Sequence, residues 1–477
     1  MFNSWSSVLV TVGLFVTLCN SLLIDSITNT WENTHYLRTV DLASSFVKEN
    51  DLIEIKNIGE LPQDTYYYTL NDGFDSIDGL SIVSVTLVDQ KVQIVPVEIE
   101  PKLFKLTFPA PIAPNSKVEL KVIYVYIEGL TPLPAKLDMA QTQSLLIKLN
   151  KFPYSPYKTS EYSLHFTGIT KGQEMELFLS KDVIVSENVP DLRPRVENKS
   201  LVYGPIMEDI EPFTLQPMGL MYEHNRPLTR VENLNRSIWI TASDVDQLPI
   251  EEYYELTNNA AELSKGFSRV DWMTGRYEAE RNHWALSHLE FQTTDTTKFD
   301  DYYYSDLVGV VSTHKLIQSH LLLQPRFPIF GNWHYNFTLG WNNKLSSAVR
   351  KFHNSDDTYI VKVPIINTLA DASYNNTYLN FYLPENSEFV NVSSPVEFES
   401  ITVDNELSYL DVSKGHVKVT IHYRNLFSDI SRLDALVVYK YSKVSYFLKI
   451  AKISGFVFVG LISYYLLSLI DLSISKN

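Results

Sequence analysis

The chain has 477 residues, which is too long for one compact core and predicts two domains of about 150–200 residues. Apolar residues make up 45% and charged residues 20% of the sequence, which excludes an intrinsically disordered protein. The formal net charge of −16 argues against binding to nucleic acid or to anionic lipid headgroups, because both require a basic surface.

The residue types favour strands over helices. Tyrosine occurs 29 times and proline 22 times, while glycine occurs 17 times. The only cysteine is Cys19, so the rest of the chain has no thiol and no disulfide. A thiol-dependent or disulfide-exchange enzyme is therefore excluded, and large apolar cores must hold the fold together.

The N-terminal segment has the features of a signal peptide. Residues 8–18 form an uncharged apolar run that is too short to cross a bilayer. Cys19 and Ser21 then supply the small side chains that signal peptidase requires before its cleavage site. We expect residues 1–21 to be a cleaved signal peptide; a buried N-terminal strand is the alternative.

Between residues 22 and 445, alternating apolar and polar residues predict a mainly β ectodomain. From Trp333 to Trp341, every odd position is large and apolar and every even one is polar or glycine. Residues 118–124 and 417–423 alternate in the same way. Prolines cluster from Val189 to Pro227, which indicates a boundary shortly after residue 222. We predict two tandem, sandwich-like β domains, at residues 22–225 and 226–445.

A weak sequence similarity between the two halves of the chain favours two domains of similar fold. Glu32-Asn33 and Glu232-Asn233 each open a β-like segment, one in each half of the chain. The runs Tyr66-Tyr67-Tyr68 and Tyr302-Tyr303-Tyr304 are also divided between the halves.

Residues 450–470 predict a transmembrane helix. The uncharged part, Ile453 to Ile470, spans about 27 Å as a helix, which suits a thin bilayer. Lys449 and Lys452 precede this part, and Asp471 follows it. With the signal peptide, the segment predicts a single-pass membrane protein that has a lumenal body and a cytosolic tail at residues 471–477.

Small residues on the predicted helix indicate a transmembrane partner. Such residues let a second helix approach closely. The candidate helix-packing positions are Ala451, Gly455, Gly460 and Ser463.

The ectodomain contains several Asn-x-Ser/Thr tripeptides, which are acceptor sites for N-glycosylation. All of them fall in the predicted lumenal part, where we expect most to carry glycans. The acceptor residues are Asn198, Asn235, Asn336, Asn375 and Asn391.

The sequence offers no defensible catalytic, cofactor-binding or metal-binding residues. It contains no H-E-x-x-H, P-loop, G-x-G-x-x-G or G-x-S-x-G motif. His283 and His288 are five apart and should lie on different faces, and Asp300-Asp301 is best interpreted as a solvated loop. Residues 151–158 are either an ordinary turn or an exposed aromatic recognition loop, in which Phe152 and Tyr154, with Phe327 and Phe330 elsewhere, are candidates.

Several motifs, in conserved order along the ectodomain, resemble those of the ribophorin I family. The most specific is the segment from Arg326 to Trp333, followed by Asn336-Phe337-Thr338 and Gly340. The others are Tyr203-Gly204-Pro205, Tyr222-Glu223-His224-Asn225-Arg226-Pro227, Lys265-Gly266-Phe267-Ser268-Arg269 and Val310-Val311-Ser312-Thr313.

The resemblance implies an accessory subunit of the oligosaccharyltransferase complex of the endoplasmic reticulum membrane. That complex transfers a preassembled oligosaccharide from dolichyl pyrophosphate to Asn of Asn-x-Ser/Thr in nascent polypeptides, and a separate polytopic subunit carries its active site. Expected partners are that subunit, small membrane subunits and the nascent polypeptide. Longer members carry a cytosolic domain after the helix, where this chain ends at Asn477. A cell-surface adhesion or receptor ectodomain and a membrane-anchored hydrolase are the alternatives.

Overall fold

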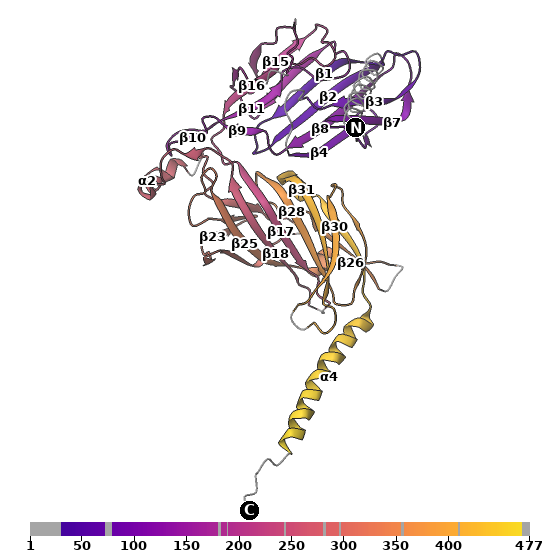
Figure 1. Ribbon diagram of the computed structural model, residues 1–477, viewed down its shortest axis with the longest axis vertical. Coiled ribbons are helices and arrows are strands. Elements are labelled where there is room, and N and C mark those ends of the chain that lie inside the picture. The colour runs from indigo at the N-terminus through magenta and orange to yellow at the C-terminus, as the bar shows by residue number, and fades with distance from the viewer. Residues whose placement is uncertain are drawn as a thin grey trace, which may run out of the picture.

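The structure is a computed structural model that describes residues 30–71, 79–179, 183–187, 189–242, 245–279, 283–294, 297–353, 357–408 and 411–469. The predicted signal peptide and the predicted cytosolic tail lie outside the described residues. The predicted fold class is confirmed: the described chain is mainly β and ends in one long apolar helix. Figure 1 shows the first half of the chain above the second and this helix below both.

The first half contains one large sheet covered by two smaller ones. The large sheet has the spatial order β14 (Pro194–Glu197), β15 (Ser200–Ile206), β12 (Tyr162–Thr167), β1 (Trp31–Asp41), β2 (Val47–Asn57), β8 (Lys117–Tyr126), β4 (Leu80–Leu87), β5 (Val92–Ile94). The smaller sheets are β3 (Gln63–Thr69), β7 (Leu103–Ile112), β6 (Val97–Glu100), and β13 (Gln173–Met175), β16 (Pro217–Glu223), β11 (Ser144–Asn150), β9 (Leu130–Pro132).

The second half has the same architecture. Its large sheet has the spatial order β30 (Ser400–Glu406), β31 (His416–Phe427), β28 (Ala372–Leu383), β17 (Thr229–Trp239), β18 (Leu248–Asn258), β25 (His334–Asn343), β21 (Asp300–Asp306), β22 (Gly309–Val310). The smaller sheets are β20 (Leu289–Gln292), β24 (His320–Leu323), β23 (His314–Ile317), and β29 (Glu388–Ser393), β32 (Asp434–Lys440), β27 (Thr358–Pro364), β26 (Val349–Lys351).

The two halves are therefore topological repeats. In all three sheets, strands follow one another in the same chain order and the same spatial order. β1 pairs in parallel with β12 as β17 does with β28, and both first strands have a β-bulge after their second or third residue. Of the strands in the described part of the chain, only β10 (Lys136–Leu137) and β19 (Glu262–Leu263) are not part of the repeat, and they pair with each other across the halves.

The repeat extends to single hydrogen bonds around one buried asparagine. Asn57 and Asn258 each end the second strand of their repeat and are fully buried. Asn115 donates its backbone N–H to the Asn57 carbonyl, and Asn332 does the same to Asn258, both at 2.8 Å. Asn115 and Asn332 share a positive φ of 60° and 61°. Glu32-Asn33 and Glu232-Asn233 open equivalent strands, β1 and β17, but they are two positions out of register: Trp31 pairs with Asn57 and Thr229 with Asn258, so Arg230 is the equivalent of Glu32. The tyrosine runs lie on the non-equivalent strands β3 and β21.

Each repeat closes a sandwich around an alternating pattern. On β25, Tyr335, Phe337, Leu339 and Trp341 are buried, as the alternation predicts. In the first repeat, the large sheet contributes Ile53 and Tyr124, and the covering sheets contribute Leu106 and Ile147 to one apolar cluster. Burial of such side chains is the main term that stabilises both sandwiches.

The halves pack directly against each other. Phe46 of the first half lies with its ring centre 5.1 Å from that of Phe427, within the apolar core of the second half. Asp371 accepts a 2.8 Å hydrogen bond from the Ser45 backbone N–H, and Arg230 pairs with Glu128 at 2.5 Å. Apolar and polar contacts together fix the two sandwiches against one another.

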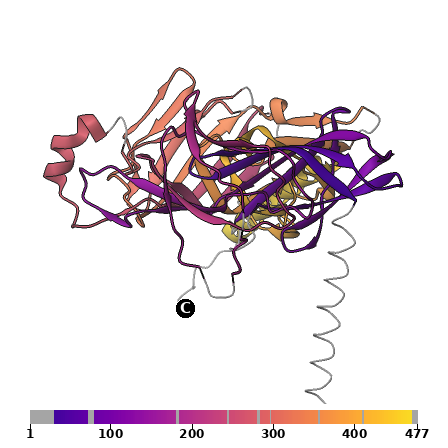
Figure 2. The ribbon, with the colours of Figure 1, turned by 90° about the horizontal axis from the view of Figure 1, so that it is seen from above.

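Helices are few in the described chain. They are α2 (Arg269–Ala279), α3 (Leu345–Ala348), the 3-10 turn η1 (Ser428–Arg432) and α4 (Lys443–Ser468). Figure 2 shows α2 projecting from one side of the body. α4 starts seven residues before the predicted span at residue 450, because Ser442 caps it by accepting a 3.2 Å hydrogen bond from the Val444 N–H.

Candidate functional site

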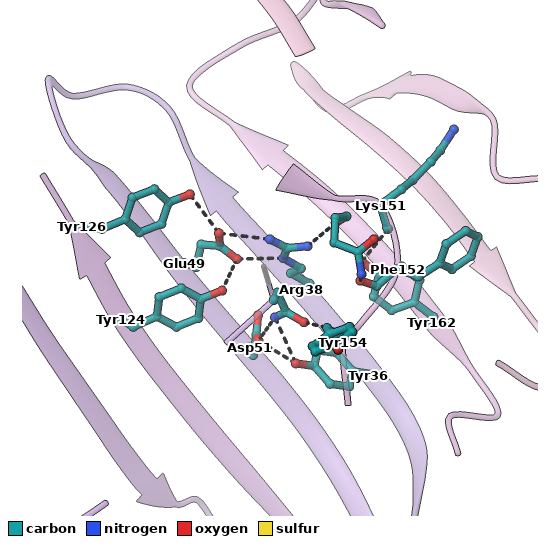
Figure 3. A network of polar contacts seen from close by, with 12 residues as sticks. Tyr36, Arg38, Glu49, Asp51, Tyr124, Tyr126, Lys151, Phe152, Tyr154 and Tyr162 are labelled. Carbon is teal, nitrogen blue, oxygen red and sulfur yellow. Dashed lines mark hydrogen bonds and ion pairs between the residues drawn. The ribbon is translucent and has the colours of Figure 1, made fainter. Parts of the chain in front are cut away.

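A buried ion pair occupies the centre of the first half. Arg38 on β1 and Glu49 on β2 point inward, at the same parity as the core residues of their strands. The Arg38 Nε and Nη2 donate to the two Glu49 carboxylate oxygens at 2.7 and 3.0 Å. Nη1 donates to the Asn150 carbonyl at 2.6 Å, so the guanidinium has partners on all three nitrogens (Figure 3).

Tyrosines complete the shell around Glu49. The hydroxyls of Tyr124 and Tyr126 donate to its two oxygens at 2.6 and 3.1 Å. Both tyrosines come from β8, which pairs with β2. Burial and the negative charge of Glu49 raise the pKa of Tyr124 well above its usual value, so this hydroxyl stays protonated and remains a donor.

A second carboxylate, Asp51, lies beside this pair. Its Oδ2 accepts from the hydroxyls of Tyr36 and Tyr68, both at 2.7 Å, and from Asn71 Nδ2 at 2.6 Å. Its Oδ1 is buried and has no hydrogen-bond partner. Burial, and next the charge of Glu49, raise the pKa of Asp51 from 3.8 to about 6.

A cavity of about 330 Å³ lies over this centre, between the two halves. Arg38, Glu49, Asn71 and Tyr126 of the first half line it. The second half contributes Leu228, Arg230, Asn259 and Ser373. The Arg230–Glu128 ion pair stands at its wall.

The second repeat has a simpler version of the same centre. Arg236 on β17 and Glu252 on β18 are fully buried and pair at 2.5 Å. Glu252 Oε2 also accepts from Tyr254 and Asn367, both at 2.8 Å. Arg236 Nε and Nη2 have no hydrogen-bond partner, and the Arg236 guanidinium lies 5.9 Å from the ring centre of Trp341.

The side chains of both centres are bound mainly to other side chains within their own half. In the first centre, Glu49 is bound to Arg38 and to two tyrosines, whereas Asp51 is bound to two tyrosines and Asn71 and keeps one carboxylate oxygen without a partner. Among the described residues, no group of three or more His, Cys, Asp or Glu side chains is placed to hold a metal ion. Neither centre was predicted from the sequence, although charged residues at the alternate positions that face the core, such as Glu49 and Asp51 between Val47 and Ile53, were a usable signal.

The aromatic candidates are placed mostly in the core. Phe152 and Phe330 are fully buried and Tyr154 is half-buried, so the interpretation of residues 151–158 as a turn was the better one. Phe327 is 40% exposed. His283 contacts the Met139 carbonyl, His288 contacts Ser287, and Asp300 and Asp301 are solvated.

The sequons lie at separate places on the surface. Asn198, in the turn between β14 and β15, and Asn235 and Asn391, on strands, are exposed. Asn336 and Asn375 are half-buried: their amides donate to Tyr253 Oη at 3.1 Å and to Glu232 Oε2 at 3.3 Å.

The small residues of α4 are open but do not share one face. A Cβ placed on Gly455 or Gly460 would meet nothing within 4 Å. At about 100° per residue, Gly455 lies about 40° from Ala451 around the helix axis, whereas Gly460 lies about 180° and Ser463 about 120° from Ala451. If all four pack against helices, two neighbours are needed rather than one.

Comparison with known proteins identifies the family. The profile of ribophorin I matches residues 31–468. Relatives named dolichyl-diphosphooligosaccharide–protein glycosyltransferase subunit 1 occur in Schizosaccharomyces pombe, at 26% identity over 89% of this chain and 92% of theirs, and in Caenorhabditis elegans, at 25% over 94% and 74%. Subunit 1B of Arabidopsis thaliana is 26% identical over 79% of both chains.

Among solved structures, the leukotriene A4 hydrolase of Saccharomyces cerevisiae has a TM-score of 0.27 and 10% identity, over 42% of this chain and 30% of that one. So low a score says nothing about function. The profile match over nearly the whole described chain shows that this protein belongs to the ribophorin I family.

Proposed function

We propose that this chain is a non-catalytic subunit of a dolichyl-diphosphooligosaccharide–protein glycosyltransferase complex. The observation that carries the proposal is the family match over residues 31–468, together with relatives that bear this subunit name. The chain would act in assembly of the complex and in handling the acceptor polypeptide. The active site would lie on a separate polytopic subunit.

The chemistry of the described residues supports a non-catalytic role. A site for a lipid pyrophosphate and a divalent cation needs several carboxylates at the membrane surface. In this chain the buried carboxylates of both sandwich centres are already bound to arginine, tyrosine and asparagine. α4 carries no Asp or Glu.

We also propose the arrangement of the chain across the membrane. Residues 22–225 and 226–445 would form two lumenal domains of the endoplasmic reticulum, with α4 in the bilayer and residues 471–477 in the cytosol. A body exposed in the lumen accounts for sequons at three exposed positions. α4 would pack against the polytopic subunit and small membrane subunits through Ala451, Gly455, Gly460 and Ser463.

Affinity purification of the full chain in a mild detergent tests the proposal. We expect a polytopic glycosyltransferase to co-purify, and the glycans to remain of the unprocessed, endoglycosidase H-sensitive type. A chain that purifies alone and carries Golgi-processed glycans would instead be a cell-surface receptor, and the proposal would be wrong.

Single Asn→Gln changes at the sequons test the orientation. Loss of one glycan mass at Asn198, Asn235 or Asn391 is expected, because these positions are exposed. If none of the five changes alters the mass, and protease added from the cytosolic side digests the body, the lumenal orientation fails.

A further inference from the structure

The end of the second half from which α4 leaves is defined by strand register. Trp239 pairs with Tyr382, Leu383 with Val417, and Glu406 with His416, so these strand ends lie together. β28 passes into β29 within a few residues, and there Glu388 pairs with Lys440, just before α4. Figure 1 shows the connections at this end beside the first turns of α4.

Outside α4, the described connections at this end carry three exposed large apolar side chains, each on a different connection. Val245 precedes β18 and is 53% exposed, Phe352 follows β26 and is 45% exposed, and Leu407 follows β30 and is 72% exposed. We call these three residues the α4-side rim. Apolar side chains gathered at one end of a body mark a surface that something apolar covers.

A buried ion cluster ties α4 to the same end. Lys449 Nζ lies 2.9 Å from Glu385 Oε2 and 2.8 Å from Asp411 Oδ1, and both carboxylates are at most 1% exposed. Backbone N–H groups of Val412 and Ser408 donate to Glu385 and Asp411 at 3.0 and 2.8 Å. Asp411 lies 3.5 Å from His416 Nε2, and His416 pairs with Glu406, the residue before Leu407.

The ion cluster around Lys449 sets the distance between the second sandwich and the hydrocarbon core of the bilayer. Lys449 precedes Ile453, the first residue of the uncharged span, by four residues, or about 6 Å of helix rise. The headgroup layer of one leaflet is about 5–7 Å thick. A lysine held by two buried carboxylates this close to the span places the protein end at the level of the headgroups.

We propose that the α4-side rim is a lipid-contacting surface, whose three apolar side chains enter the headgroup layer beside α4. The Lys449 cluster holds the rim at that depth. The occupant is a zwitterionic lipid surface rather than an anionic one, because the chain has a net charge of −16. The proposal rests only on α4 crossing a bilayer, and it stands or falls independently of membership in the glycosyltransferase complex.

Site-specific fluorescence quenching tests the rim. The full chain with Cys19→Ser and one of Phe352→Cys, Leu407→Cys or Val196→Cys is labelled with an environment-sensitive dye and reconstituted in phosphatidylcholine nanodiscs. Val196 is the matched control, since it is 62% exposed but lies on β14 of the first half. With headgroup spin-labelled lipid, quenching at 352 and 407 should be at least about twofold that at 196.

Equal quenching at all three positions would overturn the proposal, and would leave a protein partner as the cover of the rim. The triple change Lys449→Met, Glu385→Gln and Asp411→Asn removes the ion cluster without leaving a buried charge. It should bring quenching at 407 to the level at 196. Quenching that persists at 407 in this variant would refute the depth-setting role of the cluster.

Discussion

The two halves share one topology but satisfy their buried arginines differently. In the first half Arg38 has partners on all three nitrogens, and its carboxylate Glu49 has two tyrosines in addition. In the second half Arg236 makes one hydrogen bond, and its other two nitrogens have none. The elaborate centre lies under the cavity between the halves, whereas the simple one is closed inside its own sandwich. A fold thus tolerates a buried ion pair in two forms, and the fuller form occurs where solvent and a neighbouring domain come close.

The largest expected effect is at Arg38. Arg38→Met leaves Glu49 buried without its cation and should cost about 3–5 kcal/mol of stability in the first half. Arg236→Met should cost less, about 2–3 kcal/mol, because Arg236 makes one hydrogen bond where Arg38 makes three. Site-resolved hydrogen exchange of β1–β2 and β17–β18 amides in the full chain measures both. Equal costs would refute the difference between the two centres.

Asp51 adds a pH dependence to the first half. Its folded pKa of about 6 lies above its ordinary value of 3.8, so the folded state binds more protons between these values. Stability therefore falls as pH rises from about 4 to about 6, by up to about 3 kcal/mol. Asp51→Asn should remove this slope in hydrogen exchange of β2. A slope that is unchanged in the variant would assign the titration to another group.

The equivalent asparagines sharpen the comparison further. Asn258 bonds four backbone groups, those of Leu228, Ala260, Trp284 and Ile329, whereas Asn57 bonds three. Asn258→Ala should lower the free energy of unfolding by about 2–3 kcal/mol and Asn57→Ala by somewhat less, because each change leaves backbone groups without their hydrogen-bond partner. Urea unfolding of the full chain, followed by amide hydrogen exchange in each half, shows which of the two changes destabilises the protein more. A larger loss at Asn57 would contradict it.

The smallest effect is expected at the seam between the halves. Arg230→Met removes the pair with Glu128, which is partly exposed, and should cost at most about 1 kcal/mol. Glu128→Gln should cost less, because Arg230 keeps its pair with Glu232, and the double variant should cost little more than Arg230→Met alone. Rates of proteolysis in each half measure the loss of stability in the three variants. Additive losses in the double variant would show that the two side chains act separately.

Sequence patterns predicted most of the architecture. Alternation located β8, β25 and β31, and an uncharged run of residues located the membrane helix. The pairs at Glu32 and Glu232 predicted two similar domains but are not equivalent residues, because most equivalent positions have different side chains and share only burial and register. The two tyrosine runs are also not related by the repeat, because they lie on the non-equivalent strands β3 and β21.

The fold class, the apolar span and the lack of catalytic motifs could be predicted from the amino-acid sequence, because they follow from local periodicity and composition. Tertiary structure alone decided which charges meet. Arg38 contacts Asn150, more than a hundred residues away, and Lys449 contacts Glu385 and Asp411. Such pairs depend on strand order and sheet packing, which bring distant segments together by burial of apolar surface that no local pattern encodes.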